Sequence, residues 1–164
     1  MSTAELAVST QYLTYKLADE VFASDITKVR EVLDFTTITR VPKMPDFLRG
    51  VINLRGSVVP VVDLRLKFGM PKTDQTVDTC VIITEVNVDG EQTTIGVLAD
   101  SVQEVMDLDP NSIEPAPKIG TGLNMDFIKG MGKHNDGFII ILDIDKIFSP
   151  EELSAIQPGR PGAG

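Results

Sequence analysis

A segment near the middle of the chain occurs a second time 80 positions later, and this repeat constrains the fold more than any other feature. Residues 46–50 (DFLRG) match residues 126–130 (DFIKG), and the apolar run at 58–64 matches residues 138–144 without a gap. Such self-similarity predicts two copies of one structural unit and therefore two related lobes. Chance similarity between apolar segments is the alternative interpretation.

A second pair of segments supports the repeat, because residues 29–35 match residues 102–108 at a spacing of 73 positions. The copies differ at one turn, where residues 55–57 (RGS) of the first copy face residues 135–137 (NDG) of the second. The scaffold is therefore repeated, whereas the turn is specific to each copy. Arg55 is a candidate contact residue on these grounds, and a merely solvated turn residue is the alternative.

Local patterns predict a mainly β chain with short helices. The apolar runs at 51–54 and 58–62 indicate a hairpin whose turn contains Gly56, which adopts positive φ without steric cost. This hairpin would present Arg55 at its tip, and Asp63 would cap one helical turn after it. Residues 149–152 (SPEE) predict a C-terminal helix that begins with a serine cap and proline at its first position. Further strands are expected at 12–17, 21–23, the later part of 29–38, 79–88, 92–99, 102–108 and 138–142.

Composition limits the class of protein. A chain of 164 residues fits one domain, in which roughly 70% of the unfolded surface can be buried. We expect that domain at 11–156, between a flexible tail at 1–10 and a disordered tail at 157–164. The net charge of −9 disfavours nucleic acid and anionic membranes as partners. No signal peptide and no membrane-spanning apolar run is visible, which predicts a soluble, cytoplasmic protein without direct membrane insertion.

The sequence offers little for catalysis or metal binding. One cysteine and one histidine, Cys80 and His134, exclude an ordinary zinc cluster, and Cys80 lies in an apolar run that predicts a buried, inert thiol. Asp63 and Asp143 occupy equivalent positions in the repeat, but capping of the following turn explains both more simply than paired catalysis. No phosphate loop, nucleophile elbow or dinucleotide fingerprint is present. We therefore predict no catalytic, metal or cofactor site, and a binding module.

Residues 50–68 (GVINLRGSVVPVVDLRLKF) are closely similar to the signature of the CheW family of bacterial chemotaxis coupling proteins. The resemblance runs from about residue 11 to 153 and includes the segments 25–32, 96–102 and 113–117. It implies two five-stranded, SH3-like β-barrels packed together, with short helices and a C-terminal helix. It also implies a non-catalytic adaptor that links methyl-accepting chemoreceptors to the histidine kinase CheA in cytoplasmic signalling arrays.

The resemblance also assigns site residues. The helical cytoplasmic tip of the receptor would bind between the barrels, at positions that match Val29, Glu31, Gly50, Asn53, Arg55, Val102 and Val105. Ordinary core packing is the alternative for the valines, whereas Arg55 would pair with a receptor carboxylate. For the regulatory domain of CheA we expect contacts in the hairpin and loop around residues 41–44 and 113–119, at Val41, Pro42, Met44, Ile113, Pro115 and Ile119. Other copies of the adaptor are further expected partners in arrays.

Two other interpretations stay open at this point. The chain could be the regulatory domain of a CheA-type kinase, which has a related sequence. From another class, it could be a small-ligand-binding or hydrolytic double β-barrel, which would require polar or titratable groups that converge in a cleft.

Overall fold

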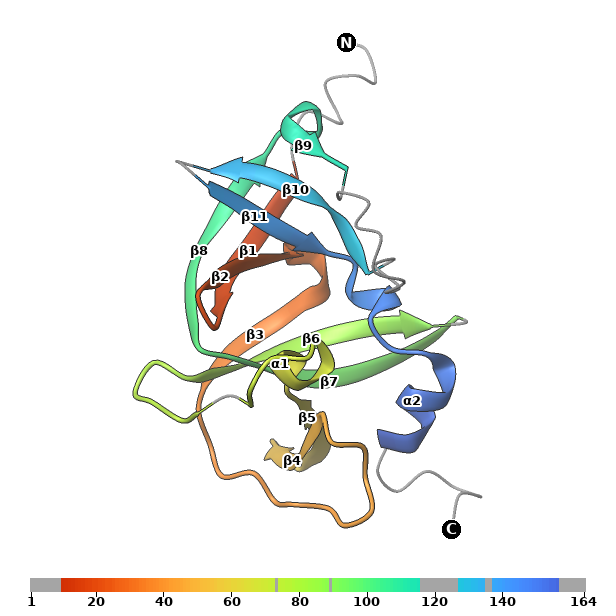
Figure 1. The fold of residues 1–164 in the computed structure, drawn as a ribbon. Helices are drawn as coiled ribbons and strands as arrows, with labels where there is room; N and C mark the ends of the chain where they lie inside the picture. The colour runs from red at the N-terminus through yellow and green to blue at the C-terminus, as the bar shows by residue number, and fades with distance from the viewer. Residues whose placement is uncertain (1–9, 73, 89, 116–126, 135–136, 157–164) are drawn as a thin grey trace.

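The computed structural model describes residues 10–72, 74–88, 90–115, 127–134 and 137–156 of the chain (Figure 1). Strands dominate, as predicted, and short helices connect some of them. The strands are β1 (Thr10–Leu17), β2 (Glu20–Asp25), β3 (Val29–Asp34), β4 (Leu48–Leu54), β5 (Ser57–Val62), β6 (Cys80–Val88), β7 (Glu91–Ala99), β8 (Ser101–Leu108), β9 (Ile113–Glu114), β10 (Ile128–His134) and β11 (Gly137–Leu142). The helices are α1 (Leu64–Lys67) and α2 (Pro150–Ile156), with 3-10 turns at Ile26–Lys28, Pro110–Ser112 and Ile144–Lys146.

The strands form two sheets that pack against each other (Figure 1). One sheet has the order β8-β1-β2-β11-β10-β9, and the other has the order β3-β6-β7-β5-β4. The mainly β class is confirmed, and the chain folds into two packed sheets. The sheets are open, however, and do not close into the five-stranded barrels that the resemblance implied.

The two repeats do not form one lobe each, because every sheet combines strands from both halves of the chain. β8 pairs with β1 of the first half, and β3 pairs with β6 of the second half. β11 then runs parallel to β2 in one sheet, as β5 runs parallel to β7 in the other. The repeated strands β3 and β8 thus occupy equivalent outer positions in the two sheets. The halves are interleaved and must fold together.

Equivalent bulges in β4 and β10 show that the repeat extends to backbone detail. The register shifts between Leu48 and Gly50 in the β4–β5 pair, and between Ile128 and Gly130 in the β10–β11 pair. An added Cβ would collide with a neighbouring segment at either glycine. Since only glycine permits so close an approach, the repeated glycine is a structural requirement in both copies.

The predicted helix caps are also present. The Asp63 carboxylate accepts a hydrogen bond from the Arg65 amide at 3.0 Å and thereby caps α1. Ser149 and Glu152 form a reciprocal capping box at the start of α2, with hydrogen bonds of 2.9 and 3.1 Å. Both caps satisfy amide groups that the first helical turn leaves unpaired.

A hydrophobic core fills the space between the sheets, and aromatic rings from both repeats meet in it. Phe68, which follows α1, stacks between Phe22 at 5.8 Å and Phe127 at 4.9 Å between ring centroids. Its counterpart in the repeat, Phe148, packs against Phe47 at 5.4 Å. These ring contacts join segments from both halves of the chain and hold the sheets together.

Cys80 lies at the start of β6 with 7% of its surface exposed. Burial raises the pKa of its thiol to about 11, and the negative charge of Asp34 adds to the effect. Because the thiolate is the reactive form, we expect iodoacetamide at pH 8 to alkylate Cys80 about two orders of magnitude more slowly in the folded protein than in urea. Mass spectrometry of timed samples measures both rates. Equal rates would show that the thiol is not buried.

Candidate functional site

The β4–β5 hairpin ends in a tight two-residue turn at Arg55 and Gly56. Both residues have positive φ, 50° and 89°, which is the combination that joins antiparallel strands without splaying them. Asn53 fixes this turn, since its side-chain oxygen accepts a hydrogen bond from the Gly56 amide at 2.7 Å. The predicted hairpin is confirmed. Asn53 before Arg55 fixes the turn by its hydrogen bond, and Gly56 after it adopts the positive φ that the turn requires.

The Arg55 side chain extends from the tip to β3, where it pairs with Glu31. One guanidinium nitrogen lies 3.3 Å from Glu31 Oε1, and the second contacts Oε2. The arginine side chain is nevertheless 70% exposed, so its remaining donors face solvent. The hydrogen bond from Arg55 lowers the pKa of Glu31, so its carboxylate stays ionised to a lower pH than a free glutamate would. The fold thus brings together three of the expected receptor-contact residues.

Gly50 is a buried support of the hairpin. Its φ is +145°, and a Cβ at this position would lie 2.2 Å from the Thr39 carbonyl oxygen and 2.7 Å from Ile38 Cγ2. Beside it, Thr39 and Val51 exchange two backbone hydrogen bonds of 2.8 Å. Gly50 therefore lets the segment after β3 pack directly on β4, which sets the position of the hairpin.

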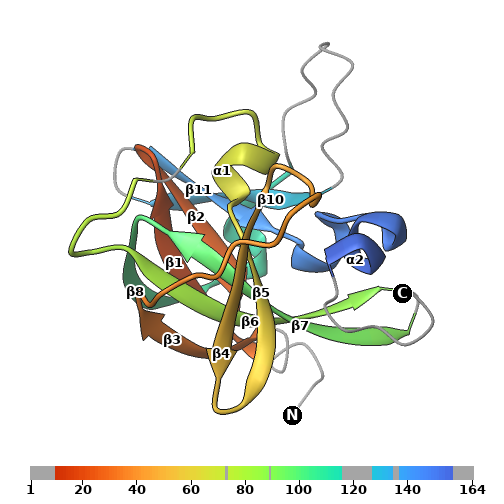
Figure 2. The same ribbon diagram turned by 90° about the horizontal axis from the view of Figure 1, so that it is seen from below.

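The expected contact valines divide into two kinds. Val29 and Val102 are half-buried and pack against the main core, as the core-packing alternative proposed. Val105 on β8 is 48% exposed. β3 and β8 each form an outer strand of their sheet, and Figures 1 and 2 show both strands on the same flank of the molecule.

The two expected kinase-contact segments lie at opposite ends of the molecule. Val41, Pro42 and Met44 line a hollow of about 440 Å³ beside β4. Ile113 begins β9 at the far end of the other sheet (Figure 1), and Pro115 follows it on the surface. Ile119 lies outside the described residues. The fold does not bring these segments together, so they present two separate surfaces.

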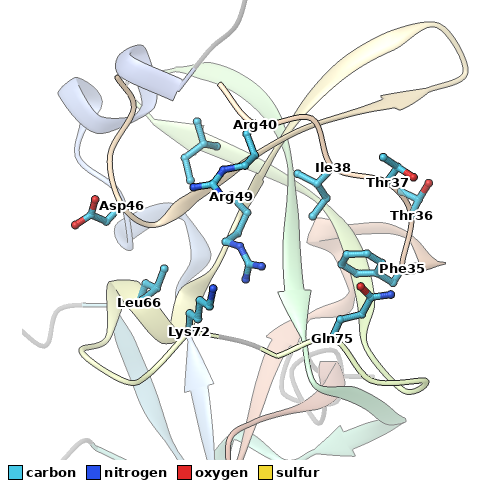
Figure 3. A pocket seen from close by; sticks show the side chains of 11 residues that line it. Phe35, Thr36, Thr37, Ile38, Arg40, Asp46, Arg49, Leu66, Lys72 and Gln75 are labelled. Atoms are coloured by element: carbon cyan, nitrogen blue, oxygen red, sulfur yellow. The ribbon is translucent and has the colours of Figure 1, made fainter. Parts of the chain in front are cut away.

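A cationic cluster that the sequence did not indicate lines a second hollow (Figure 3). Arg40, Arg49 and Lys72 come from three different segments, and no short motif connects them. Arg49 also pairs with the fully buried carboxylate of Asp63, at 3.1 Å. No pattern in the sequence reveals this cluster, because only the fold brings the three segments together.

Within the part of the chain that the structure describes, no group of histidine, cysteine, aspartate or glutamate side chains could hold a metal ion. No helix in that part is both long and apolar enough to cross a membrane.

Comparison with known proteins defines the family. A family profile described as a CheW-like domain matches residues 11–152, which is most of the chain. The chain belongs to the CheW family. Chemotaxis protein CheW of Klebsiella aerogenes is 34% identical, and the match covers 92% of this chain and 88% of that protein. A probable chemotaxis protein CheW of Rhizobium etli is 30% identical, with 88% of this chain and 91% of that protein covered.

A solved CheW structure has the same fold. It is described as the scaffolding protein TtCheW from Thermoanaerobacter tengcongensis, and it matches with a TM-score of 0.75 and 35% sequence identity. The match covers 88% of this chain and 95% of that chain. The CheW fold therefore extends over nearly the whole of both proteins.

Proposed function

We propose that this protein is a non-catalytic chemotaxis adaptor that couples methyl-accepting chemoreceptors to the histidine kinase CheA in cytoplasmic arrays. Membership of the CheW family supports the adaptor role, as does the similarity to a protein described as a scaffold. The observation that carries the proposal is the exposed Arg55 on a turn that Asn53 fixes. Arg55 pairs with Glu31 and still has guanidinium N–H groups free to bind a partner.

The receptor tip binds at the flank formed by the hairpin turn and the outer strands. Val105 supplies an exposed apolar contact for one face of a receptor helix, and Val29 and Val102 contribute their accessible edges. Arg55 donates to a receptor carboxylate while Glu31 holds the guanidinium in position. Preorganisation of this side chain reduces the entropy that is lost on binding.

Contact with the kinase uses the other two surfaces. The segment at 41–44 and the segment around Ile113 and Pro115 lie far enough apart to bind two different neighbours at once. One neighbour is the regulatory domain of CheA, and a second such domain or another adaptor copy is the other. Binding at two surfaces is what an adaptor needs in order to extend an array.

Co-sedimentation tests the proposal as a whole. Receptor-containing membranes are mixed with CheA and with or without the full chain, and the pellet is assayed for both proteins and for kinase autophosphorylation. We expect the chain to enter the pellet, to increase the amount of CheA there and to raise kinase activity. A chain that stays in the supernatant, or one that leaves kinase recovery and activity unchanged, would overturn the adaptor role.

Arg55→Glu is expected to weaken receptor binding at least tenfold, because it opposes a receptor carboxylate and places two like charges together at the tip. Receptor co-sedimentation measures the loss, and circular dichroism checks the fold. Both partners of the Arg55–Glu31 pair are charged at neutral pH. The ion pair is lost only as the pH falls through the lowered pKa of Glu31. The comparison is therefore made near pH 7.

Arg30→Glu is the matched control, since Arg30 is an exposed arginine on the same strand as Glu31 and pairs with Glu85. It carries the same change of charge and is expected to retain receptor binding. The double variant Glu31→Arg with Arg55→Glu restores an ion pair in reverse, and we expect binding to stay weak. Full recovery in the double variant would mean that the pair acts only within the protein.

A further inference from the structure

A hollow of about 770 Å³ lies on the side of the molecule formed by the segment after β3, strand β4, helix α1 and the loop after α1 (Figure 3). The proposed adaptor function does not use it. Its volume is within the range of pockets that bind small molecules.

The charges around this hollow are unusual for so acidic a protein. The chain carries a net charge of −9, yet three cationic side chains line the hollow against one carboxylate, that of Asp46. Figure 3 shows the head groups of Arg49 and Lys72 directed toward each other, and the Asp46 carboxylate directed away from them. Asp63 already compensates part of the charge of Arg49, and an anion between Arg49 and Lys72 would be attracted by both head groups.

Each cation is placed differently. Arg49 is held from below by Asp63, whose buried carboxylate fixes the guanidinium at 3.1 Å. Arg40 and Lys72 are exposed, and among the described residues neither forms an ion pair or a side-chain hydrogen bond. One anchored arginine and two adaptable cations provide both a fixed point and a closing contact for an oxyanion.

The rest of the lining suits the body of an organic molecule. Most of the exposed lining is polar, and Thr36 and Thr37 add hydroxyl groups to it. Phe35, Ile38 and Leu66 contribute a smaller apolar part. A ligand with an aromatic or aliphatic body and a single phosphate would match both parts. A bare inorganic ion would leave the apolar part of the lining uncovered.

We infer that this hollow is a binding site for a small organic phosphate, held by Arg40, Arg49 and Lys72. The site is separate from the hairpin tip, and it does not depend on the receptor contacts proposed above. Because this hollow shares Arg40 and Arg49 with the hollow that the segment at 41–44 lines, a bound ligand would lie next to one of the proposed kinase surfaces.

Phenyl phosphate is a suitable probe, since it combines an aromatic body with one phosphate. Titration into the 15N-labelled full chain, followed by NMR, is expected to shift the amide signals of residues 35–40 and 66–72 in a saturable manner. Phenol, which lacks the charge, and inorganic phosphate, which lacks the body, are expected to bind more weakly.

Two charge-neutralising variants locate the site. Arg40→Gln and Lys72→Gln are each expected to raise the Kd for phenyl phosphate about fivefold or more. Both side chains are exposed, so the fold and receptor co-sedimentation should be unchanged. Lys43→Gln is the matched control, because Lys43 borders the neighbouring hollow only and should leave the Kd as it is.

Three results would overturn the inference. The first is the absence of saturable binding, and the second is an equal loss of affinity in Lys43→Gln, which would indicate non-specific attraction. The third is tighter binding of a tetraglutamate peptide at the same residues, which would assign the hollow to an acidic segment of a partner protein. Selective binding of phenyl phosphate, weakened by the two variants alone, supports it.

Discussion

Gly50→Ala is expected to destabilise the protein by about 3–5 kcal/mol, a large part of the stability of a typical domain. Two effects combine at this position. The φ of +145° is a conformation that residues with a side chain rarely adopt, and the added Cβ would lie 2.2 Å from the Thr39 carbonyl oxygen. Relief of that collision would break the two hydrogen bonds between Thr39 and Val51. Urea unfolding monitored by circular dichroism measures the loss.

Gly56→Ala is the control that separates these effects, because Gly56 also has positive φ, +89°, but nothing lies within 4 Å of its added Cβ. Only backbone strain should remain there, about 1–2 kcal/mol. The difference between the two variants reports the close packing of the segment after β3 on β4. Equal losses would mean that this segment can move away from Gly50 at no cost.

Sequence patterns predicted the local elements well because the determinants are local. The apolar runs and the turn glycine define the hairpin β4–β5, and the apolar runs at 79–88 and 92–99 define β6 and β7; all four strands are present. The caps at Asp63 and Ser149 were predicted for the same reason, since a cap involves residues only two or three positions apart.

Strand pairing could not be predicted in the same way. The repeat indicated two related units, but periodicity does not specify the neighbour of a strand in its sheet. The exchange of β3 and β8 between the halves is a tertiary property, because it depends on which apolar surfaces meet. Whether each sheet stays open or closes into a barrel also depends on these tertiary contacts, so it too could not be predicted from the repeat.

The candidate site was predictable only in part. Arg55 was singled out because the two copies of the repeat differ at its turn, and its exposure agrees with that argument. Its pairing with Glu31, 24 positions away, was not predictable from spacing. The cationic hollow was missed because Arg40, Arg49 and Lys72 are drawn together only when three segments fold around β4.

The ion pair between Asp63 and Arg49 is the second feature on which stability depends strongly. Sequence analysis assigned only a capping role to Asp63, but its carboxylate is fully buried and also accepts from the Arg49 guanidinium. Removal of one partner from a buried pair leaves the other charge without compensation, which typically costs about 3–5 kcal/mol. We therefore expect Asp63→Ala to lose about this much in urea unfolding.

Asp143→Ala is the natural comparison, because Asp143 occupies the same place in the second copy of the repeat. Its carboxylate caps the following turn through the Asp145 amide at 3.2 Å, but its side chain is 30% exposed and lies 3.9 Å from Lys146. The expected loss is that of a cap alone, about 1 kcal/mol. If Asp63→Ala costs no more than this, the buried pair adds nothing to the cap.

Asp63→Asn separates the two roles of Asp63 within a single position. Asparagine caps a helix about as well as aspartate, so the hydrogen bond to the Arg65 amide can persist while the negative charge is removed. A loss close to that of Asp63→Ala would assign the stability to the charge opposite Arg49, and a loss near zero would assign it to the cap. We expect the first result, because Arg49 is only 27% exposed and water cannot fully replace its buried carboxylate.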